Sequence, residues 1–154
     1  MTVAGLLLAA GAGRRYGMPK ALVRLGGRLL VERGARTLRA GGCDPVVVVL
    51  GAAADRVRAE AVLDTAVVVD NPEWPSGMGS SLSRGLLATL DPGVEAALVL
   101  LVDLPGVTPA AVRRVAALAS PDALVMAGYG SRRGHPVLLG REHWAGVSAA
   151  AIGD

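Results

Sequence analysis

A glycine-rich segment that carries three basic side chains follows the first apolar run of the chain. It reads Leu8-Ala9-Ala10-Gly11-Ala12-Gly13-Arg14-Arg15-Tyr16-Gly17-Met18-Pro19-Lys20. Small residues allow the backbone to approach a phosphate closely, and successive N–H groups in a tight turn form an anion-binding concavity. Arg14, Arg15 and Lys20 add positive charge that can balance a triphosphate. Lys20 is also the only lysine among 16 basic residues, although arginine serves equally well wherever a solvated charge suffices.

Two widespread phosphate-binding motifs do not account for this segment. A Walker loop requires Gly-Lys followed by serine or threonine, and the chain has Pro19-Lys20-Ala21 there. A dinucleotide fingerprint requires Gly-x-Gly-x-x-Gly and an acidic residue after the second strand, where this chain has Tyr16 and Leu50-Gly51. The Walker interpretation therefore fails. A dinucleotide site fits poorly and stays open, beside a plain strand-to-helix turn.

A second polar segment, residues 70–82, has the sequence DNPEWPSGMGSSL. Its Asn-Pro pair indicates a turn, and Ser80 can cap a helix that follows. These structural roles leave the length of the loop unexplained, as well as two glycines beside two serines. The bare backbone of Gly77 and Gly79 and the hydroxyls of Ser80 and Ser81 can instead face a nucleobase or a phosphate at a helix start. We favour this second interpretation.

Two single residues also stand where a chemical role is conceivable. Asp103 directly follows an apolar run and opens the tetrapeptide DLPG, so it is either a turn residue or a carboxylate ligand for Mg²⁺. His135 stands beside the last apolar run, where a histidine is either a structural hydrogen-bonding group or part of a pocket wall. Trp74 and Trp144 are compatible both with a pocket wall and with core packing.

Apolar runs precede each of these polar segments and predict buried strands. They are Val3–Ala9, Pro45–Leu50, Thr65–Val69 and Ala96–Val102, with the weaker Ala123–Ala127 and Pro136–Leu139. Helical spacing predicts helices over Leu29–Ala40, Ala53–Leu63, Ser80–Leu90 and Pro109–Ala119, the last opening on the capping residue Thr108. This alternation predicts a three-layer α/β fold with a doubly wound, mostly parallel sheet. Ligands bind such sheets beyond the carboxyl ends of the strands, where the polar segments lie.

The pattern changes at residues 128–134, GYGSRRG, which predict the turn of an antiparallel hairpin element. No break in composition divides the 154 residues, so we expect a single domain over residues 1–154. With 52% hydrophobic but only 3% aromatic residues, its core is expected to consist of alanine, valine and leucine.

The composition also excludes several classes of protein. One cysteine and two histidines leave no basis for a disulfide, a thiolate zinc site or a histidine metal centre. The net charge of +3 is spread along the chain, which disfavours a nucleic-acid partner. No apolar run approaches the roughly 20 residues that cross a bilayer, and no signal-peptide pattern is present. We therefore expect a cytoplasmic protein with no membrane partner.

Four segments together resemble the MobA-like nucleotidyltransferase family, and most closely its molybdenum cofactor cytidylyltransferase branch. The family signature L-A-[AG]-G-x-[GS]-x-R-[MY]-G-x-x-K is met at every fixed position from Leu8 to Lys20. The patterns N-P-x-x-x-x-G-x-x-x-S-L, D-x-P-G and G-[NH]-P-V-L follow in order from Asn71, Asp103 and Gly134. The resemblance implies a Rossmann-like fold of the nucleotide-diphospho-sugar transferase type. It also implies transfer of a nucleoside monophosphate to a phosphorylated acceptor with release of pyrophosphate.

The resemblance also implies roles for individual residues. Arg15, Lys20 and Asp103 would act in catalysis, His135 would contact the acceptor, and the cofactor Mg²⁺ would be held by Asp103 and Asp154. The nucleotide would contact Leu8, Ala9, Ala10, Gly11, Ala12, Gly13, Lys20, Asn71, Gly77, Ser80 and Ser81. Related sequences continue past the position of Asp154 as G-D-x-G-A-R, so a domain ending here would lack a C-terminal extension.

The choice of substrate depends on fewer residues. Ala10 stands where the guanylyltransferase branch has a second glycine, which favours CTP, molybdopterin as the acceptor, and a molybdoenzyme or its chaperone as a protein partner. A pocket methyl discriminates by only about 1–3 kcal/mol, so GTP stays open, as does a phospholactate or sugar phosphate acceptor. Two other classes also stay open: an NAD(P)H-dependent oxidoreductase on the same fold and a non-catalytic pterin-binding protein.

Overall fold

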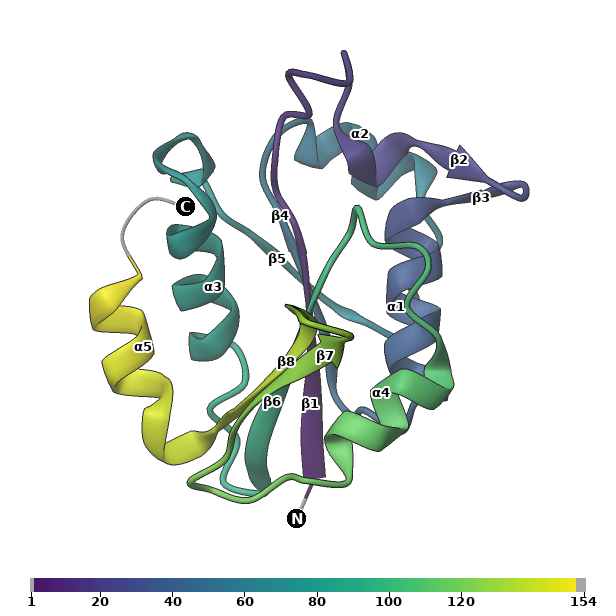
Figure 1. The fold of residues 1–154 in the computed structure, drawn as a ribbon. Helices are drawn as coiled ribbons and strands as arrows, with labels where there is room; N and C mark the ends of the chain where they lie inside the picture. Colours follow the sequence, from purple (N-terminus) through teal and green to yellow (C-terminus); the bar gives the residue numbers. More distant parts are fainter. Residues whose placement is uncertain (1, 152–154) are drawn as a thin grey trace.

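The computed structural model describes residues 2–151, and its centre is a six-stranded sheet with strand order β5-β4-β1-β6-β8-β7. The strands are β1 (Thr2–Ala9), β4 (Val46–Leu50), β5 (Val67–Asp70), β6 (Val94–Leu101), β7 (Leu124–Tyr129) and β8 (Arg132–Gly140). The helices are α1 (Leu30–Ala40), α2 (Ala54–Glu60), α3 (Met78–Leu87), α4 (Pro109–Ala116) and α5 (Trp144–Ala150). Figure 1 shows α3 and α5 on one face of the sheet and α1 and α4 on the other. The predicted three-layer α/β fold is confirmed.

The central strand β1 is buried on both faces because its leucines alternate between two cores. Leu6 belongs to the buried cluster on the α3 side, and Leu7 belongs to the cluster on the α1 side. A glycine in each helix allows the close approach. A Cβ at Gly34 of α1 would lie 2.8 Å from Cδ1 of Leu7, and a Cβ at Gly85 of α3 would lie 2.3 Å from Cδ1 of Leu6. Small residues therefore let the layers pack tightly around a core with few aromatic side chains.

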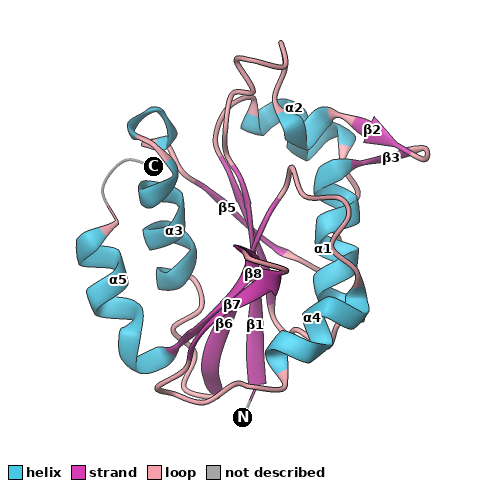
Figure 2. Cartoon of the chain, in the orientation of Figure 1, coloured by secondary structure: helices cyan, strands magenta, loops and turns pink. Residues whose placement is uncertain are grey.

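The strand order places a ligand-binding crevice at the end of β1. The chain adds β4 and then β5 on one side of β1, and crosses through α3 to place β6 on the other side. These four strands run parallel. Figure 2 shows the strands of the sheet in magenta between the cyan helices. The carboxyl ends of β1 and β6 thus meet at the point where the order reverses, which is where open α/β sheets bind their ligands.

Helix boundaries differ from the sequence prediction at several ends. Helix α2 stops at Glu60 rather than Leu63, because Ala61 is extended and the N–H of Val62 donates to Glu32 on α1. Helix α3 starts at Met78 with Gly77 as its N-cap, so Ser80 lies inside the first turn and the predicted Ser80 cap is wrong. Both α3 and α4 end three residues before the predicted ends, at Leu87 and Ala116.

The N-cap predicted for α4 is correct. The hydroxyl of Thr108 accepts the N–H of Ala111 at 3.1 Å. Helix α5 was not predicted from the sequence, and neither were the short hairpin of β2 (Arg24–Leu25) and β3 (Arg28–Leu29) or the single turns η1 (Lys20–Leu22), η2 (Trp74–Ser76) and η3 (Arg141–His143). In the part of the chain that the structure describes, no helix is both long enough and apolar enough to cross a membrane.

The predicted hairpin element is present and carries His135. Strand β8 runs antiparallel to both β6 and β7. Its pairing with β7 shifts in register where Met126 pairs with Val137 but Ala127 pairs with Gly134, so His135 and Pro136 bulge out of the ladder. The hydroxyl of Tyr129 donates to the carbonyl of His135 at 2.7 Å and holds this bulge. Because of this bulge, His135 has no partner residue in the ladder between β7 and β8.

Candidate active site

A cleft of about 630 Å³ opens at the carboxyl ends of β1 and β6. Its walls come from three parts of the chain that are distant in sequence. The end of β1 and the segment after it contribute Leu8, Ala10, Gly11, Ala12, Gly13, Arg14, Arg15, Tyr16 and Lys20; the loop after β5 and the first turn of α3 contribute Trp74, Pro75, Gly77, Met78 and Ser81; the end of β6 and the residues after it contribute Leu101, Val102 and Asp103. The structure thus brings together most of the residues that the sequence analysis proposed.

The glycine-rich loop folds back on itself at Gly13. The N–H groups of Tyr16 and Gly17 donate to the carbonyl of Gly13 at 3.0 and 2.8 Å. Gly13 has φ +64°, and a Cβ there would lie 1.9 Å from the carbonyl oxygen of Met18. A side chain at this position would therefore clash with backbone and not only strain the turn. The backbone before Gly13 stays open, since a Cβ at Gly11 would meet nothing within 4 Å.

Positive charge gathers on one wall of the cleft. Lys20 begins the turn η1, and its Nζ lies 4.9 Å from the centroid of the Tyr16 ring, a cation–π geometry. Arg14 and Arg15 are exposed on the same loop and also line the cleft. This wall can balance an anion with several charges, such as a triphosphate.

Asp103 brings a carboxylate to the cleft from the end of β6. Among residues 2–151, it is the one carboxylate on the cleft wall. His135 does not line the cleft but lies close enough to sense this charge. Burial lowers the pKa of His135, and the negative charge of Asp103 opposes that shift without cancelling it. Burial therefore favours the neutral form of the His135 imidazole.

Asn71, Ser80 and Ser81 form a hydrogen-bonded group next to the loop that precedes α3. The Asn71 amide donates to the hydroxyls of Ser80 and Ser81 at 2.8 and 2.9 Å and accepts the N–H of Glu73 at 3.0 Å. Asn71 is only 2% exposed. The Ser80 hydroxyl donates to the carbonyls of Gly77 and Glu73, away from the cleft. Ser81 accepts from Asn71 and lines the cleft, so its hydroxyl proton can serve a ligand.

Several proposed site residues therefore lie outside the cleft wall. These are Ala9, Asn71, Ser80 and His135. Ala9 points to the α1 side of the sheet and is 2% exposed. Asp154 lies outside the described residues. The cleft also includes Tyr16, Pro75 and Met78, for which no role was predicted; their position within or beside the matched motifs was the available signal. Trp74, for which a pocket wall and core packing both stayed open, lines the cleft as well.

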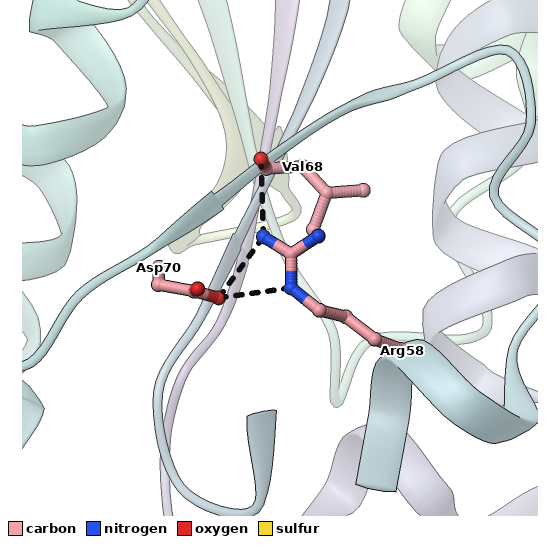
Figure 3. Close-up of polar contacts among 3 residues, drawn as sticks. All are labelled: Arg58, Val68 and Asp70. Carbon is pink, nitrogen blue, oxygen red and sulfur yellow. Dashed lines mark hydrogen bonds and ion pairs between the residues drawn. The ribbon is translucent and has the colours of Figure 1, made fainter. Parts of the chain in front are cut away.

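Figure 3 shows how the strand next to this loop is held. Arg58 of α2 donates to the Asp70 carboxylate through Nε at 3.2 Å and Nη2 at 3.1 Å, and to the carbonyl of Val68 at 3.4 Å. Asp70 ends β5, directly before Asn71. The pair therefore ties α2 to the start of the loop that forms one wall of the cleft.

The residues of the cleft fit a divalent cation that is shared with a substrate. Among residues 2–151, no three histidine, cysteine, aspartate or glutamate side chains gather into a ligand set. Mg²⁺ does not require one, because it commonly binds through one or two carboxylates together with substrate phosphates and water. Asp103 lies on the same cleft as the glycine-rich loop and Lys20, so a carboxylate and a phosphate could share the ion there.

The amino-acid sequence matches the model of a known protein family. The MobA-like NTP transferase domain matches residues 5–154. The chain belongs to the MobA-like NTP transferase family. The match spans every segment that builds the cleft, and membership of this family identifies the protein as a transferase, a nucleotidyltransferase of the MobA-like family.

Two curated relatives carry different names. The chain is 42% identical over 160 residues to the nicotine blue oxidoreductase of Paenarthrobacter nicotinovorans, a match that covers 99% of this chain and 78% of that protein. It is 37% identical over 110 residues to a probable molybdenum cofactor guanylyltransferase of Opitutus terrae, covering 70% of this chain and 51% of that protein. The chain thus spans about half the length of the second relative.

Solved structures of a mycobacterial protein share the fold. Rv0371c from Mycobacterium tuberculosis H37Rv has a TM-score of 0.87 and 29% identity, covering 97% of this chain and 76% of that one. Its complex with manganese has a TM-score of 0.85 and 27% identity, covering 100% of this chain and 78% of that one. Both likenesses extend across the whole sheet and its covering helices.

Proposed function

We propose that this MobA-like protein transfers a nucleoside monophosphate from CTP to a phosphorylated acceptor of the molybdopterin type and releases pyrophosphate. One observation carries the proposal. Among residues 2–151, a single cleft joins an open glycine-rich backbone, three cationic side chains, one carboxylate and a hydroxyl group, that of Ser81, which accepts from Asn71. Each of these features meets one part of a nucleoside triphosphate: its phosphates, its charge, its metal ion and its base.

The reaction needs no general base. A phosphate oxygen of the acceptor attacks the α-phosphorus of the triphosphate; the new P–O bond forms as the bond to the β-phosphate oxygen breaks, and pyrophosphate leaves with the electron pair. A phosphate monoester has a second pKa near 6, so the attacking oxygen is already ionised at neutral pH. This requirement agrees with a cleft whose described wall carries a single carboxylate, Asp103, and no histidine.

Catalysis in this proposal depends on alignment and charge neutralisation. The open backbone of Ala10–Gly13 would hold the β- and γ-phosphates. Lys20 and Arg15 would offset the charge that develops on the α-phosphate and on the leaving pyrophosphate. Asp103 would hold Mg²⁺, which when bound would neutralise and orient the triphosphate. The manganese complex of Rv0371c supports the use of a divalent cation.

The choice of CTP depends on Ala10, and the choice of acceptor depends on one relative. Ala10 lines the cleft and is 6% exposed, so its methyl group is part of the wall near the base. A glycine here would leave more room, which is the reason for proposing CTP rather than GTP. The molybdenum cofactor guanylyltransferase among the relatives supports a pterin acceptor, with GTP as the alternative base. Mg²⁺, a molybdoenzyme partner and a cytoplasmic location belong to the same proposal.

The 42% identical oxidoreductase favours a second candidate, an NAD(P)H-dependent reduction in the same cleft. The structure offers two arguments against a dinucleotide of the usual kind. Tyr16 occupies the position of the third glycine, and Gly51 follows β4 where an acidic residue would bind the ribose. Asp70, at the end of the next strand, is engaged with Arg58.

A ligand panel separates the two candidates. Thermal unfolding is measured with CTP, GTP, ATP and NADPH, each with and without Mg²⁺, and pyrophosphate release is then assayed with molybdopterin, phospholactate and a sugar phosphate. Magnesium-dependent stabilisation by CTP, followed by pyrophosphate release with molybdopterin, is the expected result. Stabilisation by NADPH alone would overturn the transferase proposal, and stabilisation by GTP alone would overturn the choice of base.

A further inference from the structure

The two tryptophans of the chain occupy different environments. Trp144 of α5 is 4% exposed, and its indole N–H donates to the carbonyl of Leu139 at 2.9 Å. Trp74 is only partly buried and lines the cleft. Trp144 therefore belongs to the core, whereas Trp74 is part of the cleft wall.

The backbone fixes Trp74 against the ends of two strands. A Cβ at Gly51 would lie 2.5 Å from Cβ of Trp74 and 2.8 Å from Cβ of Ala10. Trp74 thus stands directly over Gly51, which follows β4, and beside the glycine-rich loop. Its N–H donates to the carbonyl of Asn71 at 3.3 Å, and its carbonyl accepts from Gly77 at 3.2 Å. Because the residue is attached on both sides, its side chain has a defined position on the wall.

The two sides of the cleft differ in chemistry. Lys20, Arg15 and Asp103 supply the charges. Among residues 2–151, the part of the lining that contains Trp74, Pro75 and Met78 carries no charged side chain. A nucleoside triphosphate has the same division, with charged phosphates at one end and a flat aromatic base at the other. An indole face stabilises a base by stacking, and every base has a face that can stack.

We propose that Trp74 is the surface on which the nucleobase stacks; this rests on the proposed nucleotidyl transfer. Stacking supplies affinity for any base. The neighbouring Ala10 methyl and the Ser81 hydroxyl contact the edge of the base and choose between bases. Trp74 is thus a binding residue for the base and takes no part in holding the phosphates.

The test compares a ligand that has a base with one that has none. Binding of CTP, GTP and inorganic triphosphate is measured by calorimetry for the wild type, Trp74→Leu and Trp74→Phe. Loss of one base–aromatic stack is expected to raise the Kd of CTP or GTP by about 10- to 100-fold in Trp74→Leu. Trp74→Phe, which keeps an aromatic face, should lie in between. The Kd of triphosphate should not change.

A second measurement does not depend on the folding of a Trp74 variant. In Trp144→Phe, Trp74 is the only tryptophan, and its fluorescence should be quenched by saturating CTP or GTP but not by triphosphate. An unchanged fluorescence signal with bound nucleotide would overturn the inference. So would a Trp74→Leu variant that binds nucleotide as the wild type does, or one that loses triphosphate equally. If the wild type binds neither CTP nor GTP, the proposed function fails as well.

Discussion

Lys20 occupies a position where a compact ammonium on a flexible stem can follow the charge of a triphosphate. The face of Tyr16, 4.9 Å from Nζ, holds the ammonium at the cleft wall before any phosphate arrives. A guanidinium is planar and binds in a fixed fork, so it cannot follow a moving charge in the same way. This difference gives a physical reason for one lysine in a chain whose other 15 basic residues are arginines.

Removing either Lys20 or Asp103 tests the proposed chemistry most directly. Lys20→Ala and Asp103→Ala are each expected to lower kcat by about 100-fold or more, the cost of losing one charge-stabilising group in a preorganised site. Lys20→Arg should recover part of the loss. Arg36→Ala provides the matched control, because Arg36 is an exposed cation on α1 away from the cleft. Near-normal turnover of Lys20→Ala or Asp103→Ala in a pyrophosphate-release assay would contradict the assignment.

At the scale of elements, the loop between β5 and α3 is held from beneath by one side chain. The Asn71 amide makes three hydrogen bonds, two to the first turns of α3 and one back into the loop. Trp74 and Gly77 lie between these anchor points and line the cleft. Asn71 therefore shapes the nucleotide wall without touching the ligand.

Asn71→Ala should loosen this wall. The expected result is a higher KM for the nucleoside triphosphate with a smaller change in kcat, and a loss of about 1–3 kcal/mol in unfolding free energy from unsatisfied buried groups. Steady-state kinetics and urea unfolding measure the two effects. Ser76→Ala is the control, since Ser76 lies in the same loop and donates only to the carbonyl of Glu73 on the exposed side. Equal effects of both substitutions would contradict the role given to Asn71.

The spacing between α3 and the sheet depends on Gly85. An alanine there improves helix propensity by about 1 kcal/mol, but its Cβ would meet Leu6, which is fully buried. Overpacking typically costs about 1–3 kcal/mol, so Gly85→Ala should lower the unfolding free energy despite the better propensity. Gly146→Ala on α5 should stabilise instead, because its Cβ would meet nothing within 4 Å. Equal changes in Tm for the two variants would contradict this account.

On the scale of the whole molecule, Glu32 joins segments that are far apart in the sequence. Its carboxylate accepts the N–H of Leu29 at the start of α1 and the N–H of Val62 after α2, both at 2.8 Å. Burial raises the pKa of Glu32, but these two hydrogen bonds and the charges of Arg24 and Arg28 outweigh it, so the pKa lies below its usual value. The ionised form therefore stabilises the fold.

The sign of this shift sets the pH dependence. Because the folded pKa is lower than the unfolded one, the stabilisation is complete above about pH 4.3 and is lost as the pH falls through the folded pKa. Glu32→Gln should cost about 1–3 kcal/mol at pH 7, since an amide NH₂ cannot accept the second N–H. In urea unfolding the difference from the wild type should shrink towards pH 3. Glu142→Gln, at an exposed site, should change little at either pH.

Much of the fold could be predicted because its signals are local. Runs such as Val46–Leu50 are apolar on both faces, which only a buried strand explains, and Thr108 caps a helix through a bond to a residue three positions away. The ends of α2 and α3 were missed because tertiary contacts set them. The Glu32 carboxylate accepts the N–H of Val62, and α2 ends before that residue, at Glu60. Gly77 is the N-cap of α3, three residues before Ser80, which was the predicted cap.

The sequence alone determined the kind of chemistry, because the glycine-rich loop, Lys20 and Asp103 carry their signals in residue type and in order along the chain. Only the tertiary structure decided which side chains share the cleft. The reversal of strand order at β1 brings the ends of β1 and β6 together. Because consecutive residues of a helix point in different directions, Ser81 lines the cleft and the neighbouring Ser80 does not. Likewise, Trp74 faces the cleft and Trp144 the core. Local sequence cannot make these distinctions, because they depend on which distant segment packs against each residue.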